Sequence, residues 1–390
     1  MTSAFGWLDN DDAQREEMME VVKLFQDQSS VDELGIGSVR DAFSDSFFPG
    51  TSVLHTRVRY LLFIPWLLRE MARKGWSLER SRKELRSSEV RLIRSLLAGG
   101  ETRGVTGNRA QERLKTMPSA LYWPALGRLR LRRWDVSIDG YFRATSQGAK
   151  RVAEVGEDDE GSRHDLGLDP SIPPAPKGWL EETTFTLTPD EADFLKGVFA
   201  RMPRTSLISW LGANATTVAA DQIWEHPQLA DFPAEHQMRI DHARRFHHVS
   251  HGAALLYNLM LAELSGSVDL TDHYDAAIQD WEAELDQSAA LQGWSIPEFW
   301  TTVHTLNPRL KPTTEHFLTR WFKLVESGDH TSQEARSLVQ NREVRLKGNR
   351  SRLVNAAARE QWNGESGVGR LSYRWEIASS FLGDVQEGLA

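Results

Sequence analysis

Residues 51–134 form a concentrated block of positive charge. The block has nineteen Lys and Arg against six Glu and no Asp, a net charge of +13 in a chain of 390 residues whose net charge is −9. The rest of the chain therefore carries −22. Cations gathered in one part of an acidic protein attract phosphate whatever the base sequence, so this segregation predicts contact with DNA or RNA through the phosphate backbone.

Twelve basic residues are candidates for holding phosphates. A helix expected from Ser77 to about Ala98 places its leucines on one side and its cations on the opposite side. A second basic block, residues 336–375, has nine basic and three acidic residues. We expect phosphate contacts from Arg57, Arg59, Arg80, Lys83, Arg91, Arg94, Arg130, Arg132 and Arg133, and a second contact from Arg345, Lys347 and Arg350.

The arginines at 130, 132 and 133 admit two interpretations. They lie close in sequence to Tyr122, Trp123 and Trp134, and cations interleaved with aromatic rings are found on surfaces that bind single strands by stacking. The same residues could instead form an ordinary packed corner. The segment 128–134 alternates with period two at first, which allows a short strand or hairpin arm but does not exclude a helix.

Motifs for chemistry are otherwise missing. His247 and His251 are one helical turn apart, a spacing that can pair imidazoles around a metal, but there is no HExxH pattern and the sequence shows no third ligand. No phosphate-binding GxxxxGK[ST] occurs, and the chain has no cysteine. We therefore assign no catalytic residue, no metal ligand and no cofactor, and we expect a protein that is not an enzyme by itself.

Helix signals dominate the chain. Met18, Val21, Val22 and Phe25 predict an amphipathic first helix, and Ser38 with Asp41 starts a second one that Pro49 stops. A third helix is expected from near Thr51 to Leu68, kinked or broken at Pro65. Capping boxes predict helix starts at three further places, which are Thr188, Ser295 and Thr331. The fold class we expect is mainly α, with at most a few short strands.

The composition changes between residues 151 and 178 to acidic residues, Gly and Pro, which is typical of an exposed linker or long loop. We expect an N-terminal helical domain with a basic face at 1–150, this linker at 151–178, and a C-terminal helical domain at 179–390. The longest purely apolar run, residues 61–68, is far shorter than the roughly 20 residues that span a bilayer. No secretory signal is visible, so we expect no membrane contact and a cytoplasmic location.

Several segments resemble a bacterial family catalogued only as a domain of unknown function. They are FFPGTSVLHTRVR at 47–59, SALYWPALG at 119–127, HGAALLYNLMLAE at 251–263 and GRLSYRW at 369–375. The resemblance covers nearly the whole chain and brings no established catalytic residue with it. The resemblance implies genes that occur beside those of helicases and phospholipase-D-like nucleases in mobile or phage-defence islands, and hence an accessory subunit.

Three hypotheses follow from the sequence. The first is a non-catalytic, nucleic-acid-binding accessory subunit of a bacterial defence or DNA-processing complex. The second is a protein-interaction scaffold, whose basic block docks onto an acidic partner such as a helicase or nuclease subunit. The third, which the sequence favours least, is a metal-dependent nuclease or hydrolase that uses His247 and His251.

Overall fold

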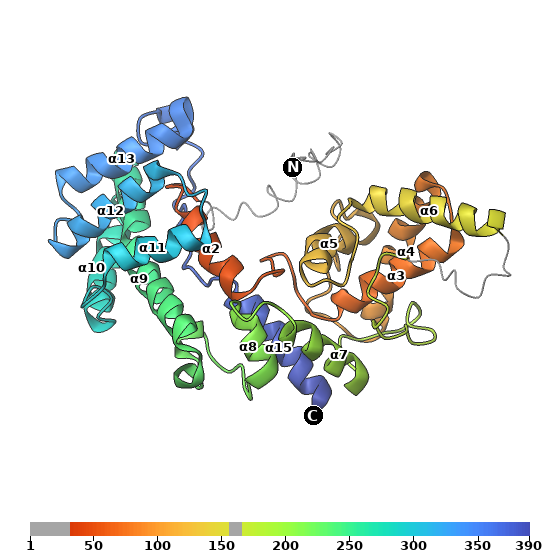
Figure 1. The fold of residues 1–390 in the computed structure, drawn as a ribbon. Helices are drawn as coiled ribbons and strands as arrows, with labels where there is room; N and C mark the ends of the chain where they lie inside the picture. The colour runs from red at the N-terminus through yellow and green to blue at the C-terminus, as the bar shows by residue number, and fades with distance from the viewer. Residues whose placement is uncertain (1–31, 156–165) are drawn as a thin grey trace, which may run out of the picture. The chain divides into compact units, whose positions relative to one another are not determined.

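The computed structural model describes residues 32–155 and 166–390, and for residues 149–155 it describes the backbone alone. The helix predicted at Met18 to Phe25 lies outside these ranges. The described chain is mainly α-helical, as the sequence predicted (Figure 1). Within it no residue belongs to a named strand, and one isolated antiparallel bridge joins Arg132 to Leu168. No helix in the described ranges has both the length and the apolar content needed to cross a membrane.

The chain folds into two compact units. Unit 1 combines the residues before Asp45 with Asp231–Tyr373, and unit 2 combines Asp45–Ala230 with Arg374–Ala390. The chain passes from one unit to the other at three places, and one of these places lies within helix α2 (Gly37–Phe47). Each unit thus takes segments from both sides of residues 151–178. This division differs from the sequential one that composition suggests, and the linker boundary stays a prediction.

Unit 2 is built around helix α3 (Tyr60–Lys74). Every side chain from Tyr60 to Leu68 is buried, because a helix that is apolar on all sides is stable only inside a core. Pro65 lies within the helix without ending it. Unit 2 also contains α4 (Leu78–Ala98), α5 (Pro118–Arg128), α6 (Ile138–Val155), α7 (Pro189–Ala200), α8 (Leu207–Asn214) and α15 (Trp375–Leu389), with short 3₁₀ turns at Gln111–Arg113, Ile223–Glu225 and, across the unit boundary, Leu229–Asp231.

The predicted start of the third helix near Thr51 is wrong. Residues before Tyr60 form turns held by side chains: the Thr51 hydroxyl donates to the carbonyl of Phe48 at 2.7 Å, and the His55 ring accepts from the Ser52 amide at 3.2 Å. Such bonds offer the backbone an alternative to helix. The carboxylate of Asp384, on α15, then accepts the Val58 amide at 3.1 Å, a partner that no local pattern reveals.

Several helix ends follow their sequence signals. Ser77 caps α4 by accepting the Arg80 amide, and the helix ends at Ala98, as predicted. Thr188 and Glu191 form the expected capping box of α7, with Pro189 in the first helical turn. The last of the predicted boxes is displaced by one residue, because Ser332 and not Thr331 caps its helix, by accepting the Ala335 amide.

Unit 1 is organised around the long helix α9 (Ala234–Ser265), which packs along α10 (Val268–Gln287) after a left-handed turn at Gly266 (Figure 1). The other helices of unit 1 are α11 (Ile296–Leu306), α12 (Pro312–Glu326), α13 (Gln333–Lys347) and α14 (Ala356–Arg359), with a 3₁₀ turn at Gly348–Arg350. Gly252 lets α9 approach α10 closely, since a Cβ there would lie 2.3 Å from the ring of the buried Trp281.

We predict that Gly252→Ala lowers the free energy of unfolding by about 2 kcal/mol, as overpacking in a core does, although alanine favours helix. Trp281 cannot move aside easily, because its Nε1 donates to the carbonyl of His248 at 2.7 Å. Gly197→Ala is the matched control: it lies in α7 and its nearest neighbour is 3.8 Å from the added Cβ, so stability should hold or rise. Denaturant unfolding of both variants measures the difference, and equal stability would contradict the packing described here.

Candidate nucleic-acid interface

Helix α4 presents a row of cations to solvent. Its apolar side is buried in unit 2 through Leu85, Leu92, Ile93 and Leu96. The basic residues of the opposite side are all exposed, and these are Arg80, Lys83, Arg91 and Arg94. From Arg80 to Arg94 the row extends over about 21 Å of helix at 1.5 Å per residue. It is therefore long enough to contact several phosphates of one strand.

The charges of this row differ in their availability. Arg94 forms an ion pair with Glu112, and both side chains are well exposed, so the pair is weak. The guanidinium of Arg80 lies 4.4 Å from the centre of the Trp76 ring. Lys83 and Arg91 have no carboxylate within ion-pair distance in the described part of the chain. These two cations are the freest of the predicted set on α4.

Arg57 and Arg59 hold unit 2 together. Arg57 donates to both oxygens of Asp384, at 3.0 and 2.7 Å. Arg59 is only 5% exposed and donates to Glu191 at 2.9 Å and to the carbonyl of Thr184 at 2.7 Å. A buried guanidinium with these partners cannot reach a phosphate outside the core. We therefore leave Arg59 out of the proposed interface, and Arg57 contributes little to it.

The arginines after α5 take mostly the packed arrangement. Arg132 has an 8% exposed side chain that lies over the ring of Trp123 at 4.7 Å and donates to the carbonyls of Trp134 and Val136. Arg133 is exposed and donates to the carbonyl of Leu168 at 3.1 Å. Arg130 is exposed at a positive φ of 61°. The segment is a corner of unit 2 rather than a strand, and only Arg130 and Arg133 reach solvent.

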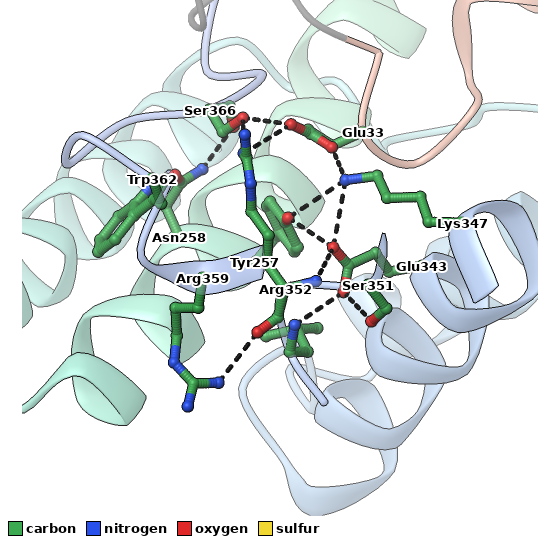
Figure 2. Close-up of polar contacts among 11 residues, drawn as sticks. Glu33, Tyr257, Asn258, Glu343, Lys347, Ser351, Arg352, Arg359, Trp362 and Ser366 are labelled. Carbon is green, nitrogen blue, oxygen red and sulfur yellow. Dashed lines mark hydrogen bonds and ion pairs between the residues drawn. The ribbon is translucent and has the colours of Figure 1, made fainter. Parts of the chain in front are cut away.

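In unit 1, Lys347 belongs to a buried network of ionic groups (Figure 2). Its ammonium pairs with Glu33 and lies 3.2 Å from Glu343, two carboxylates that are 4% and 0% exposed. Arg345 and Arg350, by contrast, are exposed. Of the second basic block, these two residues remain available to an external anion, and Lys347 does not.

The carboxylate of Glu343 shows how completely this network is satisfied. Besides Lys347 it accepts four hydrogen bonds of 2.6 to 3.0 Å, from the Tyr257 hydroxyl, the Ser351 hydroxyl and the amides of Arg352 and Leu353. Arg352 in turn donates to Glu33 and to Ser366, at 2.9 and 2.8 Å (Figure 2). A network with this many hydrogen bonds to buried carboxylates stabilises the local structure of unit 1.

The histidines of α9 gather beside Glu284 of α10. The groups of His247, His248 and Glu284 lie within 4.8 Å of one another, a spacing that could hold a metal ion, whereas His251 is not in this group. His248 contacts Glu284 at 2.7 Å and His247 contacts the carbonyl of Leu371 at 2.8 Å. Arg370 also pairs with both oxygens of Glu284. Because Arg370 already pairs with the carboxylate of Glu284, the geometry favours an ion-pair cluster over a metal site.

One group of cations was missed by the sequence reasoning. The second half of α3 carries Arg69, Arg73 and Lys74, which line a pocket of about 540 Å³ together with Trp66 and Trp179. Their sequence signal is the spacing of Trp66, Arg69 and Arg73 at i, i+3 and i+7, which places all three on one helix face. The prediction missed this spacing because the expected helix ended at Leu68, whereas α3 continues to Lys74.

The family described as "Family of unknown function (DUF6361)" matches residues 2–388. The chain belongs to this family. The match agrees with the resemblance seen in segments such as 47–59 and 251–263, and it spans both compact units. Comparison with curated proteins and with solved structures found no match. Membership in the family therefore supplies no reaction, and the arrangement of the residues has to carry any functional conclusion.

The buried pair of Arg59 and Glu191 should be essential to unit 2. Glu191→Ala leaves a desolvated guanidinium without its carboxylate, which typically costs about 3–5 kcal/mol of unfolding free energy. As the matched control, Arg91→Ala removes an exposed cation without an ion pair and should change stability by no more than about 0.5 kcal/mol. Denaturant titrations test both values. A loss below about 1 kcal/mol in Glu191→Ala would show that Arg59 is not held as described.

Acid should destabilise unit 1 through its neutral imidazoles. Burial lowers the pKa of His247 to about 4 and that of His251 to about 3, so the unfolded chain binds more protons between these values and the ordinary pKa of 6.5. The contribution of these neutral histidines to the unfolding free energy is therefore fully present above about pH 6.5, and it is lost as the pH falls toward 4. For His247 alone the loss is on the order of 2–3 kcal/mol.

Unfolding free energies measured from pH 7.5 to pH 4.5 test this dependence. His247→Gln removes the titrating group and should flatten the dependence on pH, whatever its effect on stability at pH 7.5. His316→Gln changes an exposed histidine and should leave the slope as it is in the unsubstituted protein. Parallel curves for all three proteins would contradict a neutral, buried His247.

Proposed function

We propose that this protein binds nucleic acid through the phosphate backbone, using exposed cations of α3 and α4 in unit 2. The observation that carries the proposal is the row on α4, where Arg80, Lys83 and Arg91 are exposed and none of them pairs with a carboxylate in the described ranges. Packing explains the leucine side of this helix but gives no reason for the cationic side. Backbone contacts of this kind hold DNA or RNA without reading its sequence.

Arg73 and Lys74 extend the row toward the end of α3. They precede Gly75, whose left-handed conformation (φ 57°) ends the helix, and Trp76 and Ser77 lead directly into α4. Both cations are exposed. With Arg80, Lys83 and Arg91 they make five exposed cations, at the end of α3 and along α4, that have no carboxylate partner in the described ranges. The field near such a surface is set by its own charges rather than by the net charge of the whole chain.

In this proposal the protein acts as a non-catalytic accessory subunit of a bacterial complex, such as one for phage defence or DNA processing. Helicase and nuclease subunits are the partners that its family resemblance suggests. Arg345 and Arg350 of unit 1 are offered as a second, separate contact. A scaffold that docks an acidic protein onto α4 is the alternative, and the same exposed cations support it.

Gel-shift titrations of the full chain with a duplex and a single strand, at several salt concentrations, test the proposal. We expect the double variant Lys83→Gln/Arg91→Gln to bind more weakly and to lower the salt slope by about 0.9 for each lost duplex contact, or about 0.7 for a single strand. The control Arg309→Gln/Lys311→Gln removes two exposed cations of unit 1 and should leave both quantities unchanged.

Two outcomes would count against nucleic-acid binding. An equal affinity and slope in Lys83→Gln/Arg91→Gln would exclude the α4 row as the interface. If the full chain binds neither the duplex nor the single strand at low salt, yet the α4 variant loses a co-purifying acidic protein, the scaffold alternative replaces the proposal.

A further inference from the structure

The pocket beside α3 has the size and rigidity of a small-molecule site. Its volume of about 540 Å³ lies within the range of roughly 300–1,000 Å³ that ligand pockets occupy. One wall is the second half of α3, and the other is the segment that leads from Pro174 and Ala175 to Trp179. All of its lining residues belong to unit 2.

The apolar part of this pocket consists of Pro174, Ala175 and the two largely buried rings of Trp66 and Trp179. Trp66 and Trp179 meet edge to face, with their centres 5.3 Å apart. Trp179 also stacks on Phe63 at 5.6 Å, and the Trp66 Nε1 donates to the carbonyl of Pro173 at 2.7 Å. Each ring is thus fixed by at least one contact besides that with the other tryptophan, so the wall is already formed without a ligand. Preformed sites bind with less loss of conformational freedom.

Three cations line the same pocket and one carboxylate opposes them. Arg73, Lys74 and Glu70 are exposed, and no ion pair joins Glu70 to a neighbouring cation within the described chain. Arg69 lies deeper, and its guanidinium donates only two long hydrogen bonds of 3.4 Å, to the carbonyls of Ile172 and Asp169. Its donors are therefore poorly satisfied, and the net charge of the lining is positive.

Arg69 also lies in an unfavourable electrostatic position. Desolvation, followed by repulsion from Arg73, lowers the pKa of its guanidinium. An anion between Arg69 and Arg73 would relieve that repulsion and supply charge-assisted acceptors to the underused donors. The charge and the apolar wall together fit a ligand that is anionic at one end and flat and apolar at the other.

We propose that this pocket binds a nucleoside monophosphate unit, with the phosphate at Arg69, Arg73 and Lys74 and the base against the apolar wall that Pro174 and Ala175 form with the two tryptophans. The unit can be a free nucleotide or the phosphorylated end of a strand. The second source rests on the proposed function, because it requires the strand to continue along the exposed cations of α4. The first source does not.

Calorimetric titrations of the full chain distinguish these sources. The probes are adenosine monophosphate, inorganic phosphate, and a ten-nucleotide single strand without a terminal phosphate, with a 5′-phosphate or with a 3′-phosphate. We expect the nucleotide to bind more tightly than inorganic phosphate, and one phosphorylated end to improve strand binding about tenfold, as charge-assisted hydrogen bonds would.

The test variant is Arg73→Gln/Lys74→Gln, and the matched control is Lys83→Gln/Arg91→Gln. Each double variant removes two exposed cations of one helix, α3 or α4, that form no ion pair with any described residue, so both proteins should fold. The first pair should abolish nucleotide binding and the preference for a phosphorylated end. The second pair should weaken all strands equally and leave binding of the free nucleotide unchanged.

The outcomes separate the two proposals. If the protein binds strands without preferring a phosphorylated end, and does not bind the free nucleotide, the pocket proposal is overturned and the proposed function stands. Nucleotide binding that Arg73→Gln/Lys74→Gln removes, in a chain that binds no strand, supports the pocket and overturns the proposed function. Nucleotide binding that the same variant leaves unchanged places the ligand elsewhere and overturns the pocket.

Discussion

A charge that leaves water must meet an opposite charge or several hydrogen-bond partners, and this requirement decides which cations of the chain remain available to a ligand. Arg59 meets Glu191 inside unit 2, and Lys347 meets Glu33 and Glu343 inside unit 1. These cations fix helices and loops. Exposed cations such as Lys83 and Arg91 have no such partner in the described part of the chain, so they remain available to an external anion.

Sequence patterns predicted the features that depend on neighbours along the chain. The cap at Ser77, the end of α4 near Ala98 and the separation of leucines from cations around that helix all follow from local spacing. The exposure of four predicted cations on α4 follows as well, because the burial of Leu92 turns the opposite side outward. For a helix with one apolar side, local spacing is sufficient.

Partners that are distant in the chain could not be predicted in this way. Arg57 pairs with Asp384, 327 positions later, and Arg352 pairs with Glu33, 319 positions earlier. Both arginines look like surface cations in the sequence, because nothing near them marks a burial site. The pocket beside α3 has the same origin: the spacing of Trp66, Arg69 and Arg73 is local, but Trp179, which completes the wall, comes from more than a hundred residues further on.

Buried, paired cations and exposed, unpaired cations therefore have different roles: the first stabilise the fold, and the second are available to a ligand. A paired, buried cation such as Arg59 stabilises its unit, and the carboxylate of Glu191 balances its charge. An exposed cation without a partner adds to the field that an approaching polyanion feels, and fields from neighbouring cations add together. The end of α3 and the solvent side of α4, which a short connection joins, carry Arg73, Lys74, Arg80, Lys83 and Arg91. In the proposed function it is their combined field, rather than the total charge of the chain, that attracts the nucleic acid.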